Sequence, residues 1–268
     1  MKAGLLIALM LAAAMPAQQG RGIGRLGERY SRREPAGLTT DQRIAYWEKR
    51  VKEADGETGT MPTWPARFAK NRETTDFSYV DRASSLIDRA LTADPDNYEA
   101  LRLRVEVAMN HHRFPQVIEY SEKLIERNPG DTGTIGLLGD ALMEMGRYED
   151  AEREYKRMLD LSGSLFTYNR YAYYLFVTGK KAEALAWMAQ AVEAGSRLPE
   201  HEAWCLVEFG DMLFKTGQVE LAESMYNRAI TKLPTYHRAN AALGRLQASR
   251  NKISTAMSYF QKAQASVP

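Results

Sequence analysis

Residues 203–234, AWCLVEFGDMLFKTGQVELAESMYNRAITKLP, contain two consecutive apolar patterns with the spacing of an α-helix. In the first half, residues three and four positions apart share one helical face: Leu206, Phe209, Gly210 and Leu213. The second half repeats this arrangement with Ala222, Tyr226 and Ala229. Gly217 separates the two patterns and Pro234 ends the second. We therefore predict two short helices that pack back to back and touch closely through their small residues.

The small residue at Gly210 has a counterpart in four other stretches of the chain. The five aligned positions are Val105, Gly139, Ala172, Gly210 and Gly244. Neighbouring positions are 34, 33, 38 and 34 residues apart, and the longer step indicates about four extra residues around Arg197–Glu200. The turn between the two helices carries Gly146, Gly179, Gly217 and Asn251 in successive units. These residue types accept the left-handed conformation at a helix C-terminus, so we expect that conformation at each turn.

This recurrence resembles the tetratricopeptide repeat, a family of helix–turn–helix units of 34 residues. The resemblance implies an all-α fold, a right-handed superhelical solenoid of about five to six repeats. Stacked repeats bury a continuous core and curve around a concave surface. In members of this family the first helix of each unit lines that surface, and proteins or peptides bind there.

The N-terminus has the composition of an exported chain. Lys2 is followed by an apolar run over residues 3–15 and then by Pro16 and Ala17. A charged start, a short apolar core and small residues describe a secretory signal peptide. We expect a periplasmic or secreted bacterial protein, with an uncleaved short anchor as the alternative. The predicted organisation is a signal peptide at 1–17, a flexible basic linker at 18–38, a divergent helical N-terminal cap with a half repeat at 39–97, and five repeats at 98–268.

Two helices are expected inside the N-terminal cap. Thr39 and Gln42 form a capping box that begins a helix running to about Ala54. Glycines and prolines predict a loop over 55–65. A second helix is expected to begin at Ser78 and to end before Pro95. The basic linker before the cap is either a solvated leader or a tether to an anionic partner.

The sequence contains no set of residues that we would assign to catalysis, to a metal or to a cofactor. His111 and His112 are adjacent, so on a helix they point to different faces and lack the spacing of a ligand pair. Cys205 is the single cysteine and is interpreted as a packed thiol. The net charge of +2 gives no reason to expect nucleic acid. We therefore expect a non-enzymatic protein without a cofactor and without a membrane span in its mature chain.

The repeat resemblance implies which side chains line the concave surface. The predicted partner-binding groove contains Arg102, Asn110, Asn169, Arg170, Tyr173, Phe176, Trp204 and Phe214. Aromatic residues and arginine are common anchors of protein interfaces, and a bound peptide or helix would find apolar and polar contacts here. The alternative interpretation is that the aromatic residues pack against neighbouring helices.

Three functions are consistent with these features. The first is a protein–protein interaction scaffold or adaptor of the bacterial cell envelope. The second is a substrate-binding or auxiliary subunit of an envelope polysaccharide-processing enzyme, in which the aromatic residues stack on sugars. The third is an assembly factor that forms a homodimer through a terminal repeat.

Overall fold

The computed structural model describes residues 38–53, 67, 70, 71, 74, 76–196 and 198–266. Within these residues every regular element is a helix and there is no strand, which confirms the all-α class. The predicted signal peptide, the linker up to residue 37, the loop at 55–65 and the final proline lie outside the described residues. Two compact units are distinguished, an N-terminal unit over Arg21–Leu161 and a C-terminal unit that includes Ser162–Pro268.

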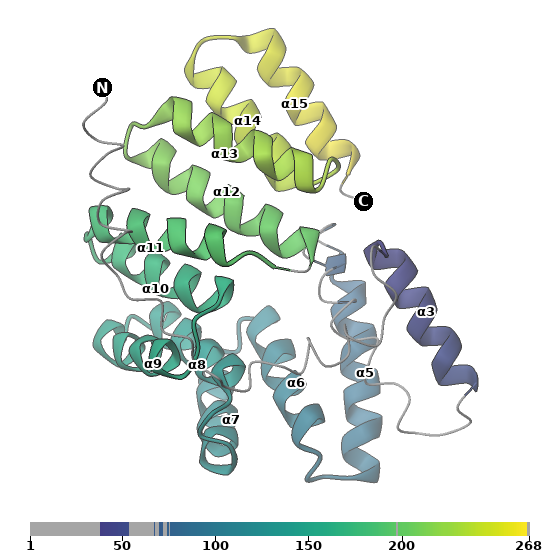
Figure 1. The fold of residues 1–268 in the computed structure, drawn as a ribbon. Helices are drawn as coiled ribbons and strands as arrows, with labels where there is room; N and C mark the ends of the chain where they lie inside the picture. Colours follow the sequence, from purple (N-terminus) through teal and green to yellow (C-terminus); the bar gives the residue numbers. More distant parts are fainter. Residues whose placement is uncertain are drawn as a thin grey trace. The chain divides into compact units, whose positions relative to one another are not determined.

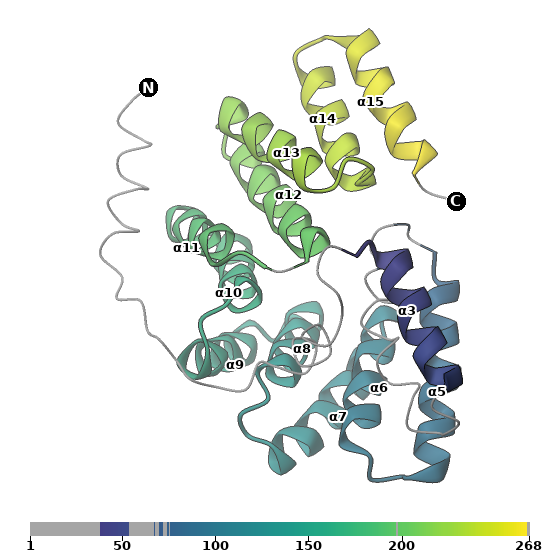
Figure 2. The same cartoon turned by 45° about the vertical axis from the view of Figure 1, so that its right-hand side comes forward.

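The helices of both units follow the predicted order of hairpins (Figure 1). The N-terminal unit contains α3 (Thr40–Glu53), α5 (Ser78–Ala93), α6 (Tyr98–Asn110), α7 (Phe114–Arg127), α8 (Thr132–Glu144) and α9 (Tyr148–Leu161). The C-terminal unit contains α10 (Leu165–Val177), α11 (Lys181–Ala194), α12 (Pro199–Lys215), α13 (Val219–Lys232), α14 (His237–Ser249) and α15 (Ile253–Ala265). In the C-terminal unit α10 packs on α11, α12 on α13 and α14 on α15 (Figure 2).

The two helices predicted before the first full repeat are present. The backbone amide of Thr39 donates to Gln42 Oε1 at 2.9 Å, and the amide of Gln42 donates to Thr39 Oγ1 at 3.3 Å. This reciprocal pair is the predicted capping box, and α3 begins directly after it. Helix α5 begins at Ser78 as expected, although the residue that supplies its cap interaction is Asp76, whose Oδ1 accepts from the Ser78 amide.

All five hairpins close their first helix in the same way. The amide of the residue after the turn donates to a carbonyl five residues earlier, as in the bonds Arg147 to Leu142 and Gln218 to Leu213. The predicted left-handed turn residues Gly146, Gly179, Gly217 and Asn251 all have positive φ, between 58° and 90°. His112, with φ of 55°, holds this position in the first hairpin, and the glycine and asparagine pattern did not predict it.

The small residues aligned in the first helices are points of close helix contact. Gly139, Gly210 and Gly244 each lie against the ring of an aromatic residue sixteen positions later, Tyr155, Tyr226 and Phe260 respectively. Gly210 belongs to α12, whose buried side chains form one cluster with those of α13 and α14. The predicted back-to-back packing of residues 203–234 is therefore present, with Ala203, Leu206, Ala222, Tyr226 and Ala229 in that cluster.

Candidate functional site

Helix α10 presents one exposed apolar and basic face. Phe166, Arg170 and Tyr173 are spaced four and three residues apart, so they lie on the same side of the helix. Phe166 is 36% exposed and Tyr173 is 45% exposed, whereas Leu165 and Ala172 beside them are buried. The helix is fixed in this rotation because Ala172 packs with Met188 of α11 and Met212 of α12. Two aromatic rings are consequently held at the surface.

Helix α12 continues this aromatic surface. The ring of Trp204 stacks on Phe166 of α10 with the ring centroids 6.3 Å apart and the planes 29° apart. His201, one turn before Trp204, makes a T-shaped contact with the same phenylalanine, with the ring centroids 4.7 Å and the planes 77° apart. Stacked and edge-on aromatic contacts of this kind favour a defined ring orientation. The three rings form a partly buried cluster that joins the first helices of two successive hairpins: Trp204 also packs against the hydrophobic clusters of the C-terminal unit, the His201 side chain is 17% exposed, and Phe166 is the most open of the three.

Ion pairs extend the surface from α12 to α14. Arg238 Nη2 lies 2.6 Å from Glu208 Oε1, and Arg245 Nη2 lies 3.1 Å from Asp211 Oδ1. Glu208 and Asp211 stand four and seven residues after Trp204, which places them on its face of α12. Burial alone would lower the pKa of Arg238, but the carboxylate of Glu208 raises the pKa above its ordinary value. The guanidinium therefore stays charged beside its partner.

We call this connected surface the first-helix face. It is defined by residues of α10, α12 and α14: Phe166, Arg170, Tyr173, His201, Trp204, Glu208, Asp211, Arg238 and Arg245. The aromatic rings occupy one end and the paired charges the other. Such a surface offers stacking and apolar contact beside oriented hydrogen-bond donors and acceptors, which is the composition of protein-recognition surfaces.

Three of the eight predicted groove residues lie on the first-helix face: Arg170, Tyr173 and Trp204. Phe176 and Phe214 are partly buried and pack against the hydrophobic clusters of the C-terminal unit. The ammonium of Lys215 lies 5.9 Å from the centre of the Phe176 ring, so this ring is covered on one side. For these two aromatic residues, packing between helices is their main contact.

Asn169 is placed differently from its prediction. Its side chain is 3% exposed, and its amide nitrogen lies 3.3 Å from Met188 Sδ and 3.9 Å from Cys205 Sγ. The residue belongs to the interior between α10, α11 and α12 and lines no open surface. The rotation of α10 explains this placement, because the buried residues Leu165 and Ala172 flank Asn169 at four and three residues.

The two remaining predicted residues belong to the N-terminal unit. Arg102 Nη1 lies 3.1 Å from Glu106 Oε1, and its Nε lies 3.6 Å from Glu99. Although burial would lower the pKa of Arg102, the carboxylates of Glu106, Asp131 and Glu99 raise it. Asn110 accepts a hydrogen bond from the side-chain amide of Asn71 at 3.3 Å. Both predicted residues thus have partners within their own unit.

Phe166 and His201 were not among the predicted site residues. Phe166 stands at the start of α10, four residues before Arg170 and seven before Tyr173. That spacing was visible in the sequence and could have identified it. His201 lies in the region of the extra residues around 197–200, where the repeat alignment gives no register. Its contact with Phe166 depends on how the longer helix α12 begins, which the repeat pattern does not determine.

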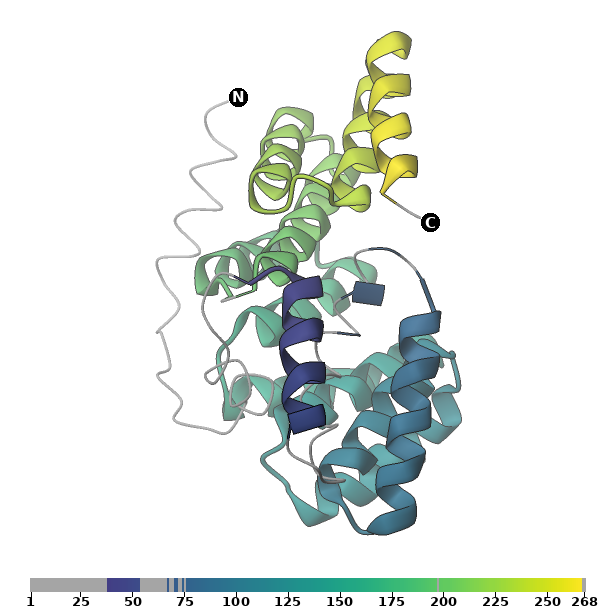
Figure 3. The ribbon, with the colours of Figure 1, turned by 90° about the vertical axis from the view of Figure 1, so that its right-hand side faces the viewer.

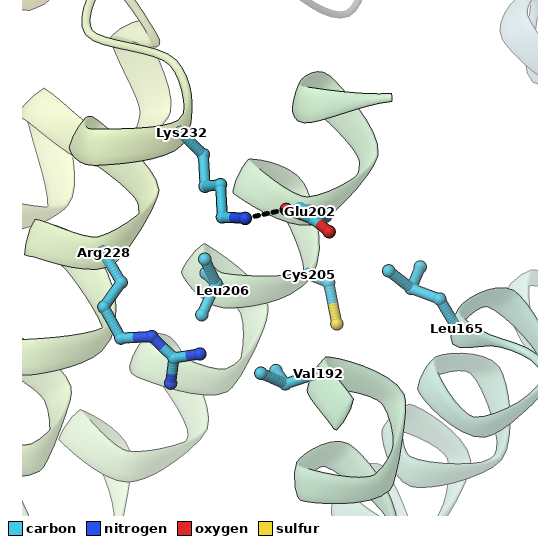
Figure 4. Close-up of a pocket in the computed structure, with 7 residues that line it drawn as sticks. All are labelled: Leu165, Val192, Glu202, Cys205, Leu206, Arg228 and Lys232. Carbon is cyan, nitrogen blue, oxygen red and sulfur yellow. Dashed lines mark ion pairs between the residues drawn. The ribbon is translucent and has the colours of Figure 1, made fainter. Parts of the chain in front are cut away.

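Cys205 has the properties of a packed thiol, as the sequence suggested. It is fully buried, and burial raises the pKa of the thiol to about 12. Figure 4 shows the side chain between Leu165 and Val192 at a small pocket that Lys232 and Glu202 border with an ion pair of 2.5 Å. A protonated, shielded thiol is a poor nucleophile at neutral pH. This site therefore gives no support for thiol catalysis.

Within the described part of the chain, no three His, Cys, Asp or Glu side chains come together in a way that could hold a metal ion. Within the same residues, no helix combines the length and the apolar character needed to cross a membrane.

Comparisons of the sequence with protein families identify the repeats. Models described as tetratricopeptide repeat match residues 134–164, 163–235 and 207–268, which together cover about half of the chain. The chain is similar to tetratricopeptide repeat protein 16 of Homo sapiens, with 22% identity over 165 residues, 57% of this chain and 18% of that protein. The corresponding protein of Macaca fascicularis is 24% identical over 165 residues. The match thus spans about a fifth of the length of these curated relatives.

Solved structures share the arrangement of helices. The Cut9–Hcn1 hetero-tetramer of the APC/C matches with a TM-score of 0.67 and 14% identity, over 85% of this chain and 42% of the other. TTC0263, a tetratricopeptide repeat protein of Thermus thermophilus, matches with a TM-score of 0.56 and 18% identity, over 68% of this chain and 92% of the other. PilW, a type IV pilus biogenesis factor, matches with a TM-score of 0.56 and 18% identity, over 64% of this chain and 78% of the other. These solved structures share the fold, and the three tetratricopeptide repeat models, which together span residues 134–268, show that the chain belongs to the tetratricopeptide repeat family.

Proposed function

We propose that this protein is a non-enzymatic interaction scaffold of the bacterial cell envelope that binds a peptide or a helix of a partner protein on the first-helix face. The observation that carries the proposal is the pair of exposed rings on α10, Phe166 and Tyr173, of which Phe166 is held by contacts with the partly buried rings of His201 and Trp204, beside the charges of α12 and α14. Exposed aromatic rings held in fixed orientations supply contact area with little loss of side-chain entropy on binding.

The charged part of the face would orient the bound segment. Glu208 and Asp211 are already paired with Arg238 and Arg245, so the local charges are balanced. A bound backbone can therefore exchange hydrogen bonds with these groups without leaving an isolated charge, which would oppose binding. The apolar end supplies affinity and the ionic end supplies direction along the face.

Envelope localisation is supported by the signal-like composition of residues 1–17 and is part of the proposal. Fractionation of cells that express the full chain tests it independently of binding. Recovery in the periplasmic or secreted fraction, with loss of residues 1–17 by mass spectrometry, is the expected result. Recovery of the full-length chain in the cytosol would contradict this part of the proposal.

Affinity purification from the native envelope tests the binding surface. The full chain is compared with a Tyr173→Ala/Trp204→Ala double variant and with Tyr148→Ala, which removes a 41% exposed tyrosine from α9. We expect a partner that the wild type and Tyr148→Ala retain and the double variant loses. Circular dichroism must show that all three chains are folded. Equal recovery by the double variant would place binding on another surface.

One specific observation keeps a second candidate function open. Rings such as Trp204 and Tyr173 can also stack on sugars, as an auxiliary subunit of a polysaccharide-processing enzyme would require. Titration with envelope polysaccharide fragments distinguishes the two functions. Binding of sugar fragments that Trp204→Ala abolishes would favour this second candidate over a protein scaffold.

A further inference from the structure

Lys215, the last residue of α12, extends the first-helix face with an exposed positive charge. It follows Trp204, Glu208 and Asp211 by eleven, seven and four residues, a spacing that keeps all four side chains on one side of the helix. Among the described residues no carboxylate pairs with its ammonium group, which lies 5.9 Å from the centre of the Phe176 ring of α10. The charge at this end of the face is therefore not neutralised.

Helix α10 places two exposed apolar side chains next to this charge. Tyr173 is 45% exposed and Val177, the last residue of α10, is 44% exposed; four residues separate them, so they share one side of the helix. Within the C-terminal unit α12 contacts both α10 and α14, and it lies between them (Figure 3). The contact of Lys215 with Phe176 shows that α10 and α12 are adjacent at their C-terminal ends. We call Tyr173, Val177 and Lys215 the α10–α12 subsite.

The carboxylates nearest to Lys215 along α12 are already engaged. Asp211, one turn earlier, lies 3.1 Å from Arg245 Nη2, and Glu208, two turns earlier, lies 2.6 Å from Arg238 Nη2. These two pairs cancel within the face, whereas the charge of Lys215 remains. An incoming carboxylate at the subsite would consequently meet an exposed ammonium group and no unpaired acid beside it on α12.

The equivalent positions of the N-terminal unit carry the opposite charge. Counting back by the repeat steps of 33 and 34 residues, the positions of the two α10 residues are held by Asp140 and Glu144 in α8 and by Glu106 and Asn110 in α6. Of these, Glu106 pairs with Arg102 at 3.1 Å. The repeat fold therefore does not determine the charge at these positions, and an acidic ligand is disfavoured on the N-terminal unit.

We propose that the α10–α12 subsite binds an acidic residue and a neighbouring large apolar residue of the partner, so that the first-helix face recognises an acidic segment. This inference rests on the proposed function, because it names the partner chemistry of the same face. The apolar side chain packs on Tyr173 and Val177, and the carboxylate pairs with Lys215. Charge complementarity of this kind contributes chiefly to specificity and to the rate of association.

The test uses the full chain and two fluorescently labelled peptides of about ten residues, which in extended form span about 33 Å and cross a face three helices wide. Both peptides contain two leucines, and the residues beside the leucines are glutamate in one and glutamine in the other. Glutamine keeps the size of the side chain and removes its charge. By fluorescence anisotropy we expect the glutamate peptide to bind about tenfold more tightly at low salt, with the preference decreasing as salt is added.

Two substitutions of Lys215 locate the preference. Lys215→Gln should weaken binding of the glutamate peptide by about two- to fivefold, the range expected for an exposed ion pair, and Lys215→Glu should weaken it by about tenfold or more. Binding of the glutamine peptide should not change in either variant. Lys215→Gln keeps the test valid if a negative charge at the end of α12 disturbs folding, because a carboxylate there opposes the helix dipole.

Lys262→Glu is the matched control. Lys262 is also an exposed lysine of the C-terminal unit whose ammonium lies over an aromatic ring, that of Tyr259 at 5.2 Å, but it belongs to the second helix of its hairpin. Its substitution changes the net charge of the chain by the same amount as Lys215→Glu. We expect the binding of both peptides to stay at the wild-type level, which separates a local contact from an effect of total charge.

Equal binding of the two peptides, or an unchanged preference in folded Lys215→Gln and Lys215→Glu variants, would overturn this inference. Equal losses in Lys215→Glu and Lys262→Glu would also overturn it, because the preference would then arise from net charge. None of these results would affect the proposed function, which depends on recovery of the native partner and its loss in the Tyr173→Ala/Trp204→Ala variant. Retention of that partner by the double variant would instead contradict the proposed function itself.

Discussion

At the scale of single residues, the residue at the close-packing position of each first helix and the residue sixteen positions later are complementary in size. Where the first is glycine, the second is an aromatic residue. The five pairs are Val105 with Ser121, Gly139 with Tyr155, Ala172 with Met188, Gly210 with Tyr226, and Gly244 with Phe260. The rings stand opposite the glycines, and a β-carbon added to Gly139, Gly210 or Gly244 would lie 2.3 to 2.6 Å from a ring carbon. Interiors are packed closely enough that such a contact forces the neighbour to move.

Gly210→Ala is therefore expected to lower the free energy of unfolding by about 1–3 kcal/mol, the usual cost of overpacking. Its β-carbon would meet Tyr226 Cε1 at 2.3 Å, and Tyr226 is held by a hydrogen bond from its hydroxyl to Asp211 Oδ1 at 2.7 Å. Urea denaturation measures the change. Gly130→Ala is the matched control, since its β-carbon would meet only Asn128 Oδ1 at an ordinary 3.7 Å.

A double-mutant cycle separates size matching from other effects of the alanine. In a Tyr226→Met background, Gly210→Ala should cost much less than in the wild type, because the third hairpin already pairs Ala172 with Met188 in one buried cluster. Equal costs in the two backgrounds would show that the tyrosine ring is not the source of the strain.

Cys205 provides a second prediction at this scale. Because burial raises its thiol pKa to about 12, from an ordinary value of 9.0, the thiol should react with an aromatic disulfide reagent only when the chain unfolds. As the pH rises, the thiol ionises in the unfolded chain before it ionises in the folded chain, which favours unfolding. The stability that the buried, protonated thiol contributes is therefore present below pH 9 and is lost between about pH 9 and pH 12. Absorbance at pH 8 should show slow modification in buffer and one reactive thiol in denaturant. Rapid modification of the folded protein would contradict the observed packing.

At the scale of helices and turns, the five hairpins share one left-handed turn position filled by different residue types. Gly217 has φ of 80° with nothing within 4 Å of an added β-carbon, so Gly217→Ala should cost about 1 kcal/mol through backbone strain alone. Asn251, with φ of 58°, already bears that strain, so Asn251→Gly should leave stability unchanged or raise it by a few tenths of a kcal/mol. Thermal unfolding of both variants tests the pair, and opposite signs from those expected would contradict it.

The helices could be predicted from the sequence because their ends are set by local interactions, whereas parts of the site could not because they depend on helix packing. Glycine and asparagine at the turns, and the capping box of Thr39 and Gln42, act within a few residues of their own position. The exposure of a groove residue depends instead on the rotation of its helix against two others. Asn169 is buried because of how α10 rests on α11 and α12, and Phe166 is exposed for the same reason. The repeat register gives that rotation only approximately.

At the scale of the whole molecule, stability is expected to fall along the C-terminal unit toward its outer edge. In repeat proteins each hairpin is stabilised chiefly by its immediate neighbours. Helix α12 buries eight residues against the helices around it, whereas α15 buries only Ala256. Segments with few buried contacts open locally at low free energy without unfolding the rest.

Hydrogen exchange measured by mass spectrometry should therefore show the fastest amide exchange on α15, intermediate rates on α14 and the slowest on α12 and α13. Gly244→Ala sharpens this expectation, because its β-carbon would strain only the contact with Phe260, a ring that is 36% exposed and can move outward. Faster exchange in that variant should be confined to α14 and α15. In Gly210→Ala it should include α12 and α13, because Tyr226 is enclosed by the cluster that joins α12, α13 and α14. Uniform protection across the unit, or identical exchange patterns in the two variants, would mean that the hairpins open together and that the nearest-neighbour description does not apply to this protein.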